Sequence, residues 1–489
     1  MKIAFLSGAF CFFTLNIWAQ WTELGVGFSG NPADNIGQFR SVSMNDEGTL
    51  MAYGAAFGDG ATTNSGYVKV YKWNESDWSQ YGQTIYGNET LEGTGASTSL
   101  NSSGVTLAIG STLAINDNGW QSGAVRVFDF IDGQWVQRGA TLYGDGSEDE
   151  NFQNDLFGIS VSLSEDGNFL AVGASFNSSV PENLENQGLV KVFQWNGLEW
   201  SVMGEPILGT QSNENFGNQV ALNASGSTLV TGGKNYNAIN GLEDTGVVEV
   251  YFWNGSSWQL MGNPIIGQLE NDRIGASVDI DADGTTVAFG GFQGAVGVFD
   301  WNGNFWMQRG FLFQGSEDIM HSVVKLSDDG NVVVIGEPWF STFTGQVRFH
   351  YWNGNNWIQF GAPILPSEDV EIFGTSLAVS SNCTEIAIGT PNVDIEGNQA
   401  GQIRVFKNEA INSVDQFENS NLTIYPNPAW DRLNLNTSNN ELWQVYDGIG
   451  NMLLRGTGNT ISGLSQLPNG IYFLDCNGKI EKFIIQKLD

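Results

Sequence analysis

Short runs in which apolar and polar residues alternate recur along most of this chain. In residues 157–173, one alternating run leads through Asp166 and Gly167 into a second β-rich run. Such alternation predicts half-buried strands, and an Asp-Gly pair between two runs predicts a tight hairpin. The same pattern returns at residues 41–54, 97–110, 220–232, 277–290, 322–336 and 376–389. The pattern therefore predicts seven copies of one β-hairpin.

A second hairpin is predicted after each of the first six copies. Residues 188–197 form a β-rich run that ends in Asn196 and Gly197, and the next run begins at Trp200. The arrangement W-x-x-x-G starts at Trp21, Trp78, Trp135, Trp200, Trp258, Trp306 and Trp357. Spacings of roughly 50–65 residues are typical of propeller blades rather than of helical solenoids. Each unit is thus predicted to be four antiparallel strands, which bury both faces by stacking on neighbouring units.

The two ends of this repeat are incomplete in complementary ways. The seventh hairpin is followed by one more β-rich run, residues 401–406, but by no W-x-x-x-G strand. Residues 21–25 carry that motif ahead of the first hairpin, where they have no local partner. We therefore expect the N-terminal strand to complete the seventh unit and to close an all-β, seven-bladed β-propeller over residues 20–407. Closure leaves short, protected sheet edges in place of an unpaired strand at each end.

The repeated hairpin is similar to a known family. Residues 157–174 follow the pattern F-G-x-S-V-x-L-S-x-D-G-x-x-L-A-V-G-A, which resembles the FG-GAP repeat of integrin α-subunit propellers and of many bacterial exported proteins. The resemblance covers about residues 21–407 and implies that the first strand of each blade lies nearest the axis and the fourth lies outermost. The integrin repeats that hold calcium have a longer hairpin loop with several aspartates, whereas this chain has tight turns such as Asp166-Gly167.

One turn carries the arrangement D-x-D-x-D-G, which makes Asp279, Asp281 and Asp283 candidate metal ligands. A calcium loop of the EF-hand kind also needs a glutamate at its twelfth position, where this chain has Gly290. In register with the other hairpins, Asp279 and Asp281 fall on a strand, where side chains two apart share one face. A Ca²⁺ site and a solvated turn both remain open. Because no intact calcium-cage motif is present, we expect no cofactor.

The net charge of the chain limits the classes of molecule that the protein is expected to bind. The chain has 19 Lys and Arg residues against 53 Asp and Glu residues, which gives a formal net charge of −34. Such a field repels nucleic acids and anionic membranes and favours solubility, cations or basic partners. We therefore expect no nucleic-acid partner. The hydrophobic fraction of 41%, with 17 Trp and 31 Phe residues, supplies enough core for two domains.

Residues 1–19 have the features of a signal peptide. Lys2 is followed by an apolar stretch over residues 3–17, and Ala19 precedes Gln20. The stretch is too short for a membrane anchor, so we expect no transmembrane segment. Cys11 follows Phe10 rather than a small residue, which argues against lipidation. The two other cysteines, Cys383 and Cys476, fall in separate predicted domains and do not form a disulfide framework.

The repeat pattern stops near residue 407. Residues 408–420 are polar and without periodicity, as in a linker. Residues 421–489 are strand-rich and contain Y-P-N-P, then V-x-D-x-x-G at Val445, Asp447 and Gly450, then G-x-Y before a final strand with lysines. This order resembles the type A C-terminal sorting domain of the type IX secretion system of Bacteroidetes. The resemblance implies a small β-sandwich that is recognised by the translocon and sorting machinery, and a secreted or outer cell-surface protein. Its sorting motif residues would be Tyr425, Pro426, Asn427, Pro428, Gly470 and Tyr472.

The ligand-binding face follows from loop lengths. In a four-stranded up-and-down blade both tight turns lie on one rim, so we expect function on the opposite rim, where the longer loops lie. Two sets of residues on that rim are candidates. Acidic links could bind cations or a basic surface, or could simply be solvated: Asp145, Glu148, Asp149, Glu150, Glu270, Asp272, Glu317, Asp318, Glu368, Asp369 and Glu371. Aromatic residues could bind a glycan or a surface protein, or could pack locally: Trp120, Trp339, Phe340 and Phe343.

The sequence carries no recognised catalytic motif. The two histidines, His321 and His350, lie far apart in the sequence. The sequence also lacks H-E-x-x-H, a Cys-His nucleophile signature, a G-x-S-x-G elbow and a phosphate loop. We therefore expect a non-enzymatic recognition or adhesion module that is exported by type IX secretion. One alternative is a secreted carbohydrate-active hydrolase or lyase that uses a carboxylate pair on the same rim. Another alternative is a structural component of a surface layer.

Overall fold

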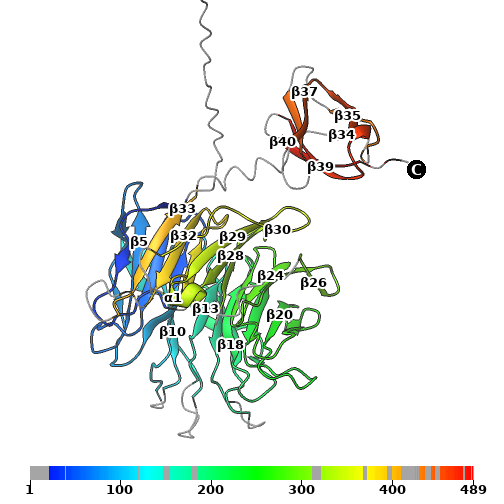
Figure 1. Ribbon diagram of the computed structural model, residues 1–489. Helices are drawn as coiled ribbons and strands as arrows, with labels where there is room; N and C mark the ends of the chain where they lie inside the picture. Colours follow the sequence, from blue (N-terminus) through cyan, green and yellow to red (C-terminus); the bar gives the residue numbers. More distant parts are fainter. Residues whose placement is uncertain are drawn as a thin grey trace, which may run out of the picture. The chain divides into compact units, whose positions relative to one another are not determined.

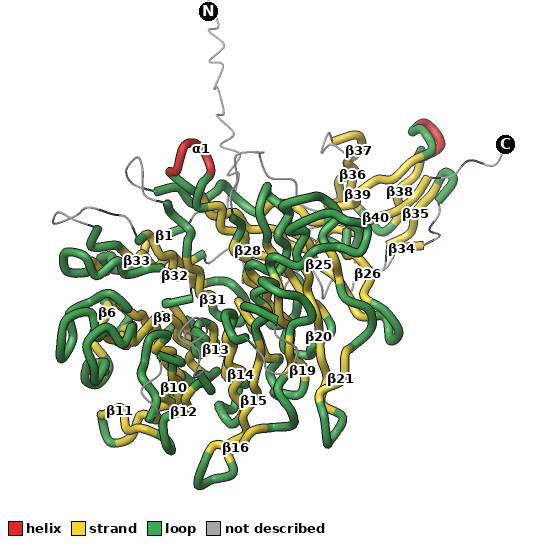
Figure 2. The backbone as a smooth tube through the Cα atoms, turned by 90° about the horizontal axis from the view of Figure 1, so that it is seen from below, coloured by secondary structure: helices red, strands yellow, loops and turns green. Residues whose placement is uncertain are grey.

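The computed structural model describes residues 21–38, 40–117, 121–146, 155–178, 184–310, 321–366, 372–391, 393, 399–408, 424–425, 427, 429–435, 442–446, 452–476, 479–485 and 487. The predicted signal peptide, residues 1–19, lies outside this set. The chain divides into two compact units, and the first unit ends at Asn408. Strands and turns dominate both units, and α1 (Phe340–Phe343) stands out as one short helical turn (Figures 1 and 2). Within the described residues, no helix combines the length and the apolar character needed to cross a bilayer.

In its described residues the first unit contains seven antiparallel sheets, each built from four strands in hairpin order. The first strands are β3 (Val42–Met44), β8 (Thr94–Leu100), β13 (Ser160–Leu163), β18 (Phe216–Leu222), β23 (Ser277–Ile280), β27 (Val323–Leu326) and β31 (Ser376–Val379). The second strands are β4 (Leu50–Ala55), β9 (Thr106–Ser111), β14 (Phe169–Ala174), β19 (Thr228–Gly233), β24 (Thr286–Gly290), β28 (Val332–Glu337) and β32 (Glu385–Thr390). We number the sheets one to seven in this order.

The outer half of each sheet follows the second predicted hairpin. The third strands are β5 (Tyr67–Trp73), β10 (Ala124–Ile131), β15 (Leu189–Trp195), β20 (Val247–Trp253), β25 (Val296–Trp301), β29 (Gln346–Trp352) and β33 (Gln402–Lys407). The fourth strands of sheets one to six are β6 (Trp78–Gln80), β11 (Gln134–Gln137), β16 (Trp200–Val202), β21 (Trp258–Leu260), β26 (Trp306–Gln308) and β30 (Trp357–Gln359). Short strands extend the outer edge of five sheets by pairing with the third strand: β7 (Ile85–Tyr86), β12 (Leu142–Tyr143), β17 (Ile207–Leu208), β22 (Ile265–Ile266) and β2 (Phe28–Ser29).

The seventh sheet is completed by the start of the described chain. Strand β1 (Thr22–Glu23) pairs antiparallel with β33, and the Leu24 amide donates to the Val405 carbonyl at 2.8 Å. The Arg404 guanidinium donates two hydrogen bonds to the Glu23 carboxylate, at 2.9 and 2.7 Å. The sequence predicted this pairing, and the structure contains it.

Each sheet buries both of its faces against neighbouring sheets. Every residue of β4, β9 and β19 is buried, as expected for strands covered on both sides. In one core cluster, Leu170 and Val172 of the third sheet pack with Val125 of the second. The first strands contact one another in chain order, and β31 of the last sheet also contacts β3 of the first. The order of contacts among the seven sheets is therefore cyclic.

One end of the sheets carries the turns that join first to second strands, and we call this end the turn rim. One residue from each turn donates its backbone N–H to the carbonyl of the matching residue in the next sheet. The seven bonds are Asp46 to Ser102, Ser102 to Glu165, Glu165 to Ala224, Ala224 to Ala282, Ala282 to Asp328, Asp328 to Ser381, and Ser381 back to Asp46. Their N···O distances run from 2.7 to 3.2 Å. These bonds form a circle that includes the step from the last sheet to the first.

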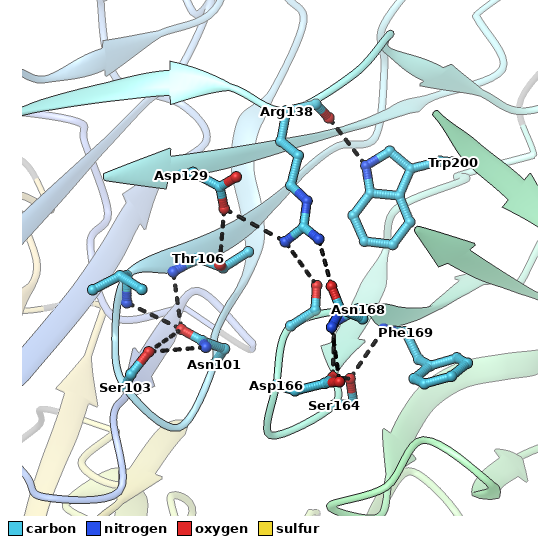
Figure 3. Close-up of polar contacts among 12 residues, drawn as sticks. Asn101, Ser103, Thr106, Asp129, Arg138, Ser164, Asp166, Asn168, Phe169 and Trp200 are labelled. Atoms are coloured by element: carbon cyan, nitrogen blue, oxygen red, sulfur yellow. Dashed lines mark hydrogen bonds and ion pairs between the residues drawn. The ribbon is translucent and has the colours of Figure 1, made fainter. Parts of the chain in front are cut away.

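The W-x-x-x-G motif also joins neighbouring sheets, because its tryptophan and its glycine contact different sheets. The Trp200 indole N–H donates to the Arg138 carbonyl at 3.0 Å, directly before Gly139 of the preceding sheet (Figure 3). Gly139 has φ +78°, and a Cβ atom there would lie 2.8 Å from the Trp195 ring. The Arg138 guanidinium lies over the rings of Trp195 and Trp200 and donates to the Asn168 side chain at 2.6 Å. Five further tryptophans make the same indole bond: Trp78, Trp135, Trp258, Trp306 and Trp357.

The second unit contains two antiparallel sheets in its described residues. One sheet consists of β34 (Ile424–Tyr425), β35 (Arg432–Leu435) and β38 (Thr460–Ser462), and the other of β37 (Met452–Thr457), β36 (Leu442–Tyr446), β39 (Gly470–Cys476) and β40 (Lys479–Ile485). A short 3-10 helix, Leu464–Gln466, follows β38. Leu433 and Ile461 of the first sheet share one core cluster with Val445, Leu474 and Phe483 of the second. The two sheets therefore pack face to face around a common apolar interior.

Candidate functional site

The end of the sheets opposite the turn rim carries the connections between second and third strands and between successive sheets, and we call it the loop rim. Trp339 and Phe340 lie there, in the connection between β28 and β29, and both are half-buried. The Trp339 ring stands edge-on to the His321 ring, with 6.1 Å between centroids. Phe343 belongs to α1, but its side chain and the whole of Trp120 lie outside the described residues. The structure thus places Trp339 beside His321, with Phe340 next to it in the chain.

The three candidate metal ligands have different surroundings. Asp279 lies on β23, and its Oδ2 accepts the Leu326 amide of the next sheet at 2.8 Å. Asp281 is buried and closes its own turn, because its Oδ1 accepts the amides of Thr285 and Thr286 at 2.7 and 2.9 Å. Asp283 is exposed. Among the described residues, no group of three or more Asp, Glu, His or Cys side chains is arranged to hold a metal ion.

The position of Asp279 explains its role in the sheet. In the second and third sheets the matching residues are Ser99 and Ser162, whose hydroxyls accept the amides of Leu163 and Leu222 at 3.0 Å. The Asp279 carboxylate makes the same bond to the following sheet. In the D-x-D-x-D-G pattern, Asp279 therefore accepts a hydrogen bond from the next sheet, and Asp281 caps the turn.

Buried acidic residues of the loop rim serve the connections between sheets. Asp272 accepts the amides of Gln268 and Leu269 with one carboxylate oxygen, at 3.2 and 2.8 Å. Glu214 accepts the amide of Gln211 at 2.9 Å in the same way. Asp145 is more exposed and forms an ion pair with Lys191 at 2.7 Å. Of the other predicted acidic links, Glu270 is described and exposed, and eight lie outside the described residues: Glu148, Asp149, Glu150, Glu317, Asp318, Glu368, Asp369 and Glu371.

The seven first strands enclose a central cavity of about 240 Å³. Residues from every sheet line it, including serines on several of the strands. Its end at the turn rim is lined by Asp46 and Asp328. Its end at the loop rim, which we call the mouth, is lined by Arg40, Gln219 and His321. The cavity is therefore acidic at one end and basic at the other.

Arg40 reaches across the mouth. It precedes β3 of the first sheet, and its Nε donates to the Gln219 side-chain oxygen of the fourth sheet at 2.6 Å. Its backbone has φ +61°, a conformation that is uncommon for residues other than glycine and that often marks functional positions. Burial lowers the pKa of Arg40 to about 10, so the guanidinium stays charged at neutral pH.

Lys234 lies near Arg40, and Arg273 lies near Lys234. Lys234 directly follows β19, at the loop-rim end of the sheet that carries Gln219. Its pKa is lowered to about 8, first by burial and then by the charges of Arg40 and Arg273. Arg273 is neutralised by Asp244 at 2.5 Å and lies over the Phe292 ring at 5.2 Å. Within the described residues, Arg40 and Lys234 have no carboxylate at ion-pair distance.

His321 is buried in this basic surrounding. Burial lowers its pKa to about 3, and the positive charges of Arg40 and Lys234 act in the same direction. His350 lies on β29, where burial and Arg348 lower its pKa to about 4. Both imidazoles are therefore neutral at pH 7.

Sequence patterns did not identify Arg40, Gln219 or Lys234, because they lie far apart in the chain and belong to no motif. One feature of the sequence could have pointed to Arg40, namely the length of the segment before the first strand. Between Gly37 and Ser41 the chain has residues 38–40, whereas a single residue separates the equivalent Gly158 and Ser160 of the third sheet. The longer lead into the first strand carries Arg40.

A second, open depression of about 800 Å³ lies on the turn rim. Asn101 and Asn223 line it, but each side-chain oxygen already accepts two amides of its own turn, at 2.9 and 3.0 Å. Its polar groups therefore hold turns together.

In the second unit, two of the predicted sorting motifs lie along β40. The Asn427 side-chain oxygen accepts the Ile484 amide at 2.9 Å, and Gly470 pairs with Ile485. Tyr472 is buried and donates its hydroxyl to the Pro468 carbonyl at 2.8 Å. Tyr425 is 60% exposed. Pro426, Pro428, Asp447 and Gly450 lie outside the described residues.

Comparison with known proteins identifies the second unit. The family described as the secretion system C-terminal sorting domain matches residues 423–488. No curated protein matches the chain. A sorting domain of this kind interacts with the type IX secretion machinery. The protein is therefore exported through type IX secretion, either into the medium or to the cell surface.

Proposed function

We propose that the first unit is a closed seven-bladed β-propeller of the FG-GAP type that acts as a non-enzymatic recognition or adhesion module. The second unit is a β-sandwich that directs export, and the sorting machinery removes it on attachment or release. The cyclic contacts among first strands and the circle of turn-rim hydrogen bonds support the propeller. The repeated F-G and W-x-x-x-G motifs support the FG-GAP type.

The recognition function is supported by a contrast in length within one scaffold. The turns between first and second strands are uniform, whereas the loops between second and third strands differ. The connections between second and third strands range from residues 291–295 in the fifth sheet to residues 175–188 in the third. Apolar side chains are exposed on them, among them Phe57, Phe176 and Ile239, and Ile239 is 95% exposed. Binding residues are commonly found on loops that a rigid scaffold positions.

A glycan array probed with the folded protein tests this function. We expect saturable binding of at least one glycan without release of product. Ile239→Ser should weaken that binding. The matched control is Leu198→Ser, because Leu198 is 82% exposed but lies in a hairpin turn at the opposite end of its sheet. Release of reducing ends from a bound polysaccharide would instead favour the carbohydrate-active enzyme.

A further inference from the structure

We propose that the mouth of the central cavity binds the carboxylate of a singly charged acidic sugar, which Arg40 of the cavity lining and the neighbouring Lys234 hold. This inference rests on the proposed recognition function and names its ligand class. It follows from the charge, the hydrogen-bonding groups and the aromatic rings that surround the mouth.

The charge of the mouth is opposite to that of the protein. The chain carries 53 acidic and 19 basic residues, so a basic residue is readily matched by a carboxylate. Arg126, Arg348 and Arg404 each face one, at 3.5, 2.6 and 2.7 Å. In the described part of the chain Arg40 and Lys234 face none, although burial makes an unmatched charge costly. An anionic ligand would neutralise both.

Hydrogen-bond donors line the same cavity as Arg40. The hydroxyls of Thr98 and Ser376 line the cavity, and both residues are at least nine-tenths buried. Within the described residues neither hydroxyl has a hydrogen-bond partner. Thr98 is next to Arg40, because its amide donates to the Arg40 carbonyl at 2.9 Å. Gln219 fixes the Nε of Arg40, which leaves the two terminal nitrogens for a carboxylate.

Aromatic rings lie at the edge of the mouth. The rings of Phe292 and Trp339 stand edge-on to His321, at 5.7 and 6.1 Å between centroids. Phe292 and Trp339 are half-buried, so part of each side chain remains accessible. A pyranose presents an apolar face to such rings and a carboxylate to the cations. The combination fits an acidic sugar better than a simple inorganic anion.

Size and net charge limit the ligand further. A cavity of about 240 Å³ is smaller than the roughly 300–1,000 Å³ of drug-sized sites, so it accepts a single sugar or the end of a chain. The net charge of −34 repels polyanions at long range, whereas one carboxylate meets mainly the local positive charge. We therefore infer a ligand with one negative group at the recognised end.

Titration calorimetry of the full-length protein at pH 7 tests the inference. The probes are glucuronate and glucose, which differ only in the carboxylate, and heparin as a polyanion. We expect glucuronate to bind and glucose and heparin to bind at least tenfold more weakly. Arg40→Gln and Lys234→Met should each weaken glucuronate binding at least tenfold, and Lys234→Arg should restore most of it. Lys72→Gln changes an exposed lysine and serves as the control.

The outcomes separate this inference from the proposed function. Equal binding of glucose and glucuronate, tighter binding of heparin, or glucuronate binding that both variants leave unchanged would overturn the acidic-sugar site. Array binding that depends on Ile239, in a protein that binds no glucuronate, would overturn the site and leave the recognition function standing. Glucuronate binding that requires Lys234, with no glycan bound on the array, would support the site and contradict recognition by the wider loop rim.

Discussion

The turn rim and the loop rim end the same seven sheets, yet their polar groups are used differently. On the turn rim, backbone amides bond from sheet to sheet in a circle, and side chains such as Asn101 and Asp281 close their own turns. On the loop rim the connections differ in length, and Arg40 and Lys234 have no carboxylate partner in the described chain. The turn rim therefore carries groups that hold the scaffold together, whereas the loop rim also carries groups that remain available to a ligand.

This division has a physical cause. A group that repeats in every sheet can bond to its copy in the next sheet, so the repeat satisfies its own hydrogen bonds. A residue that occurs in one sheet has no such copy. Arg40 lies on the longer lead that is special to the first sheet, and Lys234 lies at the end of the fourth. Specific binding is therefore expected where the repeat is broken.

The largest expected effect comes from breaking the contacts between sheets. Trp200→Ala should lower the free energy of unfolding by roughly 3–5 kcal/mol, because it removes a buried ring and its bond to the Arg138 carbonyl. Denaturant unfolding measures this change. Leu198→Ala is the control and should alter stability by less than about 0.5 kcal/mol, since Leu198 is exposed. Equal effects would contradict the role assigned to the W-x-x-x-G motif.

The second effect is a pH dependence that comes from Asp155, a buried residue between β12 and β13 whose carboxylate accepts the Gly146 amide at 2.8 Å. Burial raises the pKa of Asp155 to about 6, from 3.8 for the unfolded chain. Between these values the folded protein holds a proton that the unfolded chain releases, so stability falls as pH rises from about 4 to about 6. Above pH 6 this loss lowers the free energy of unfolding by about 2–3 kcal/mol. Asp155→Asn should remove the loss, because the variant has no carboxylate to ionise. Melting temperatures across this range test it, and an unchanged slope in the variant would rule it out.

A smaller effect is expected from the tryptophan of the W-x-x-x-G motif, which has different surroundings in two of its copies. The Trp200 indole N–H has an acceptor, whereas the buried Trp21 indole N–H has none in the described chain. Trp200→Phe should therefore cost about 1 kcal/mol more than Trp21→Phe, the net value of one hydrogen bond. Trp21 still packs on Phe349, with ring centroids 4.0 Å apart, so Trp21→Ala should destabilise. Identical costs for the two Phe variants would show that the seventh junction is built like the others.

The smallest effect concerns the turn of the fifth sheet. Asp281 occupies the position of Asn101 and Asn223 and accepts the same two turn amides. Asp281→Asn should change stability by less than about 0.5 kcal/mol, because the side-chain acceptor is kept. Thermal unfolding with and without calcium chloride measures this. A calcium-dependent rise in melting temperature that the variant abolishes would restore the metal site.

Local patterns predicted the parts of the fold that repeat. Asp-Gly turns, alternating strands and the W-x-x-x-G motif each depend on neighbouring residues, and the strand at Thr22 and Glu23 followed from counting. The role of Asp279 was harder to predict, since its register on β23 decides which amide it meets. The mouth could not be predicted, because Arg40, Gln219 and Lys234 come together only when distant sheets surround one cavity.

We propose that the seven sheets form a complete circle that is held at the turn rim and that leaves the loop rim free for recognition. Hydrogen exchange at the turn amides, read by mass spectrometry on the folded protein, tests it most directly. The Ser381 amide donates across the closing junction to the Asp46 carbonyl, and the Asp46 amide donates in the next bond of the circle, to the Ser102 carbonyl. We predict that both are protected as strongly as those of Ser102 and Glu165. Rapid exchange at Ser381, with protection kept at Ser102 and Glu165, would show an open row of sheets and contradict the account.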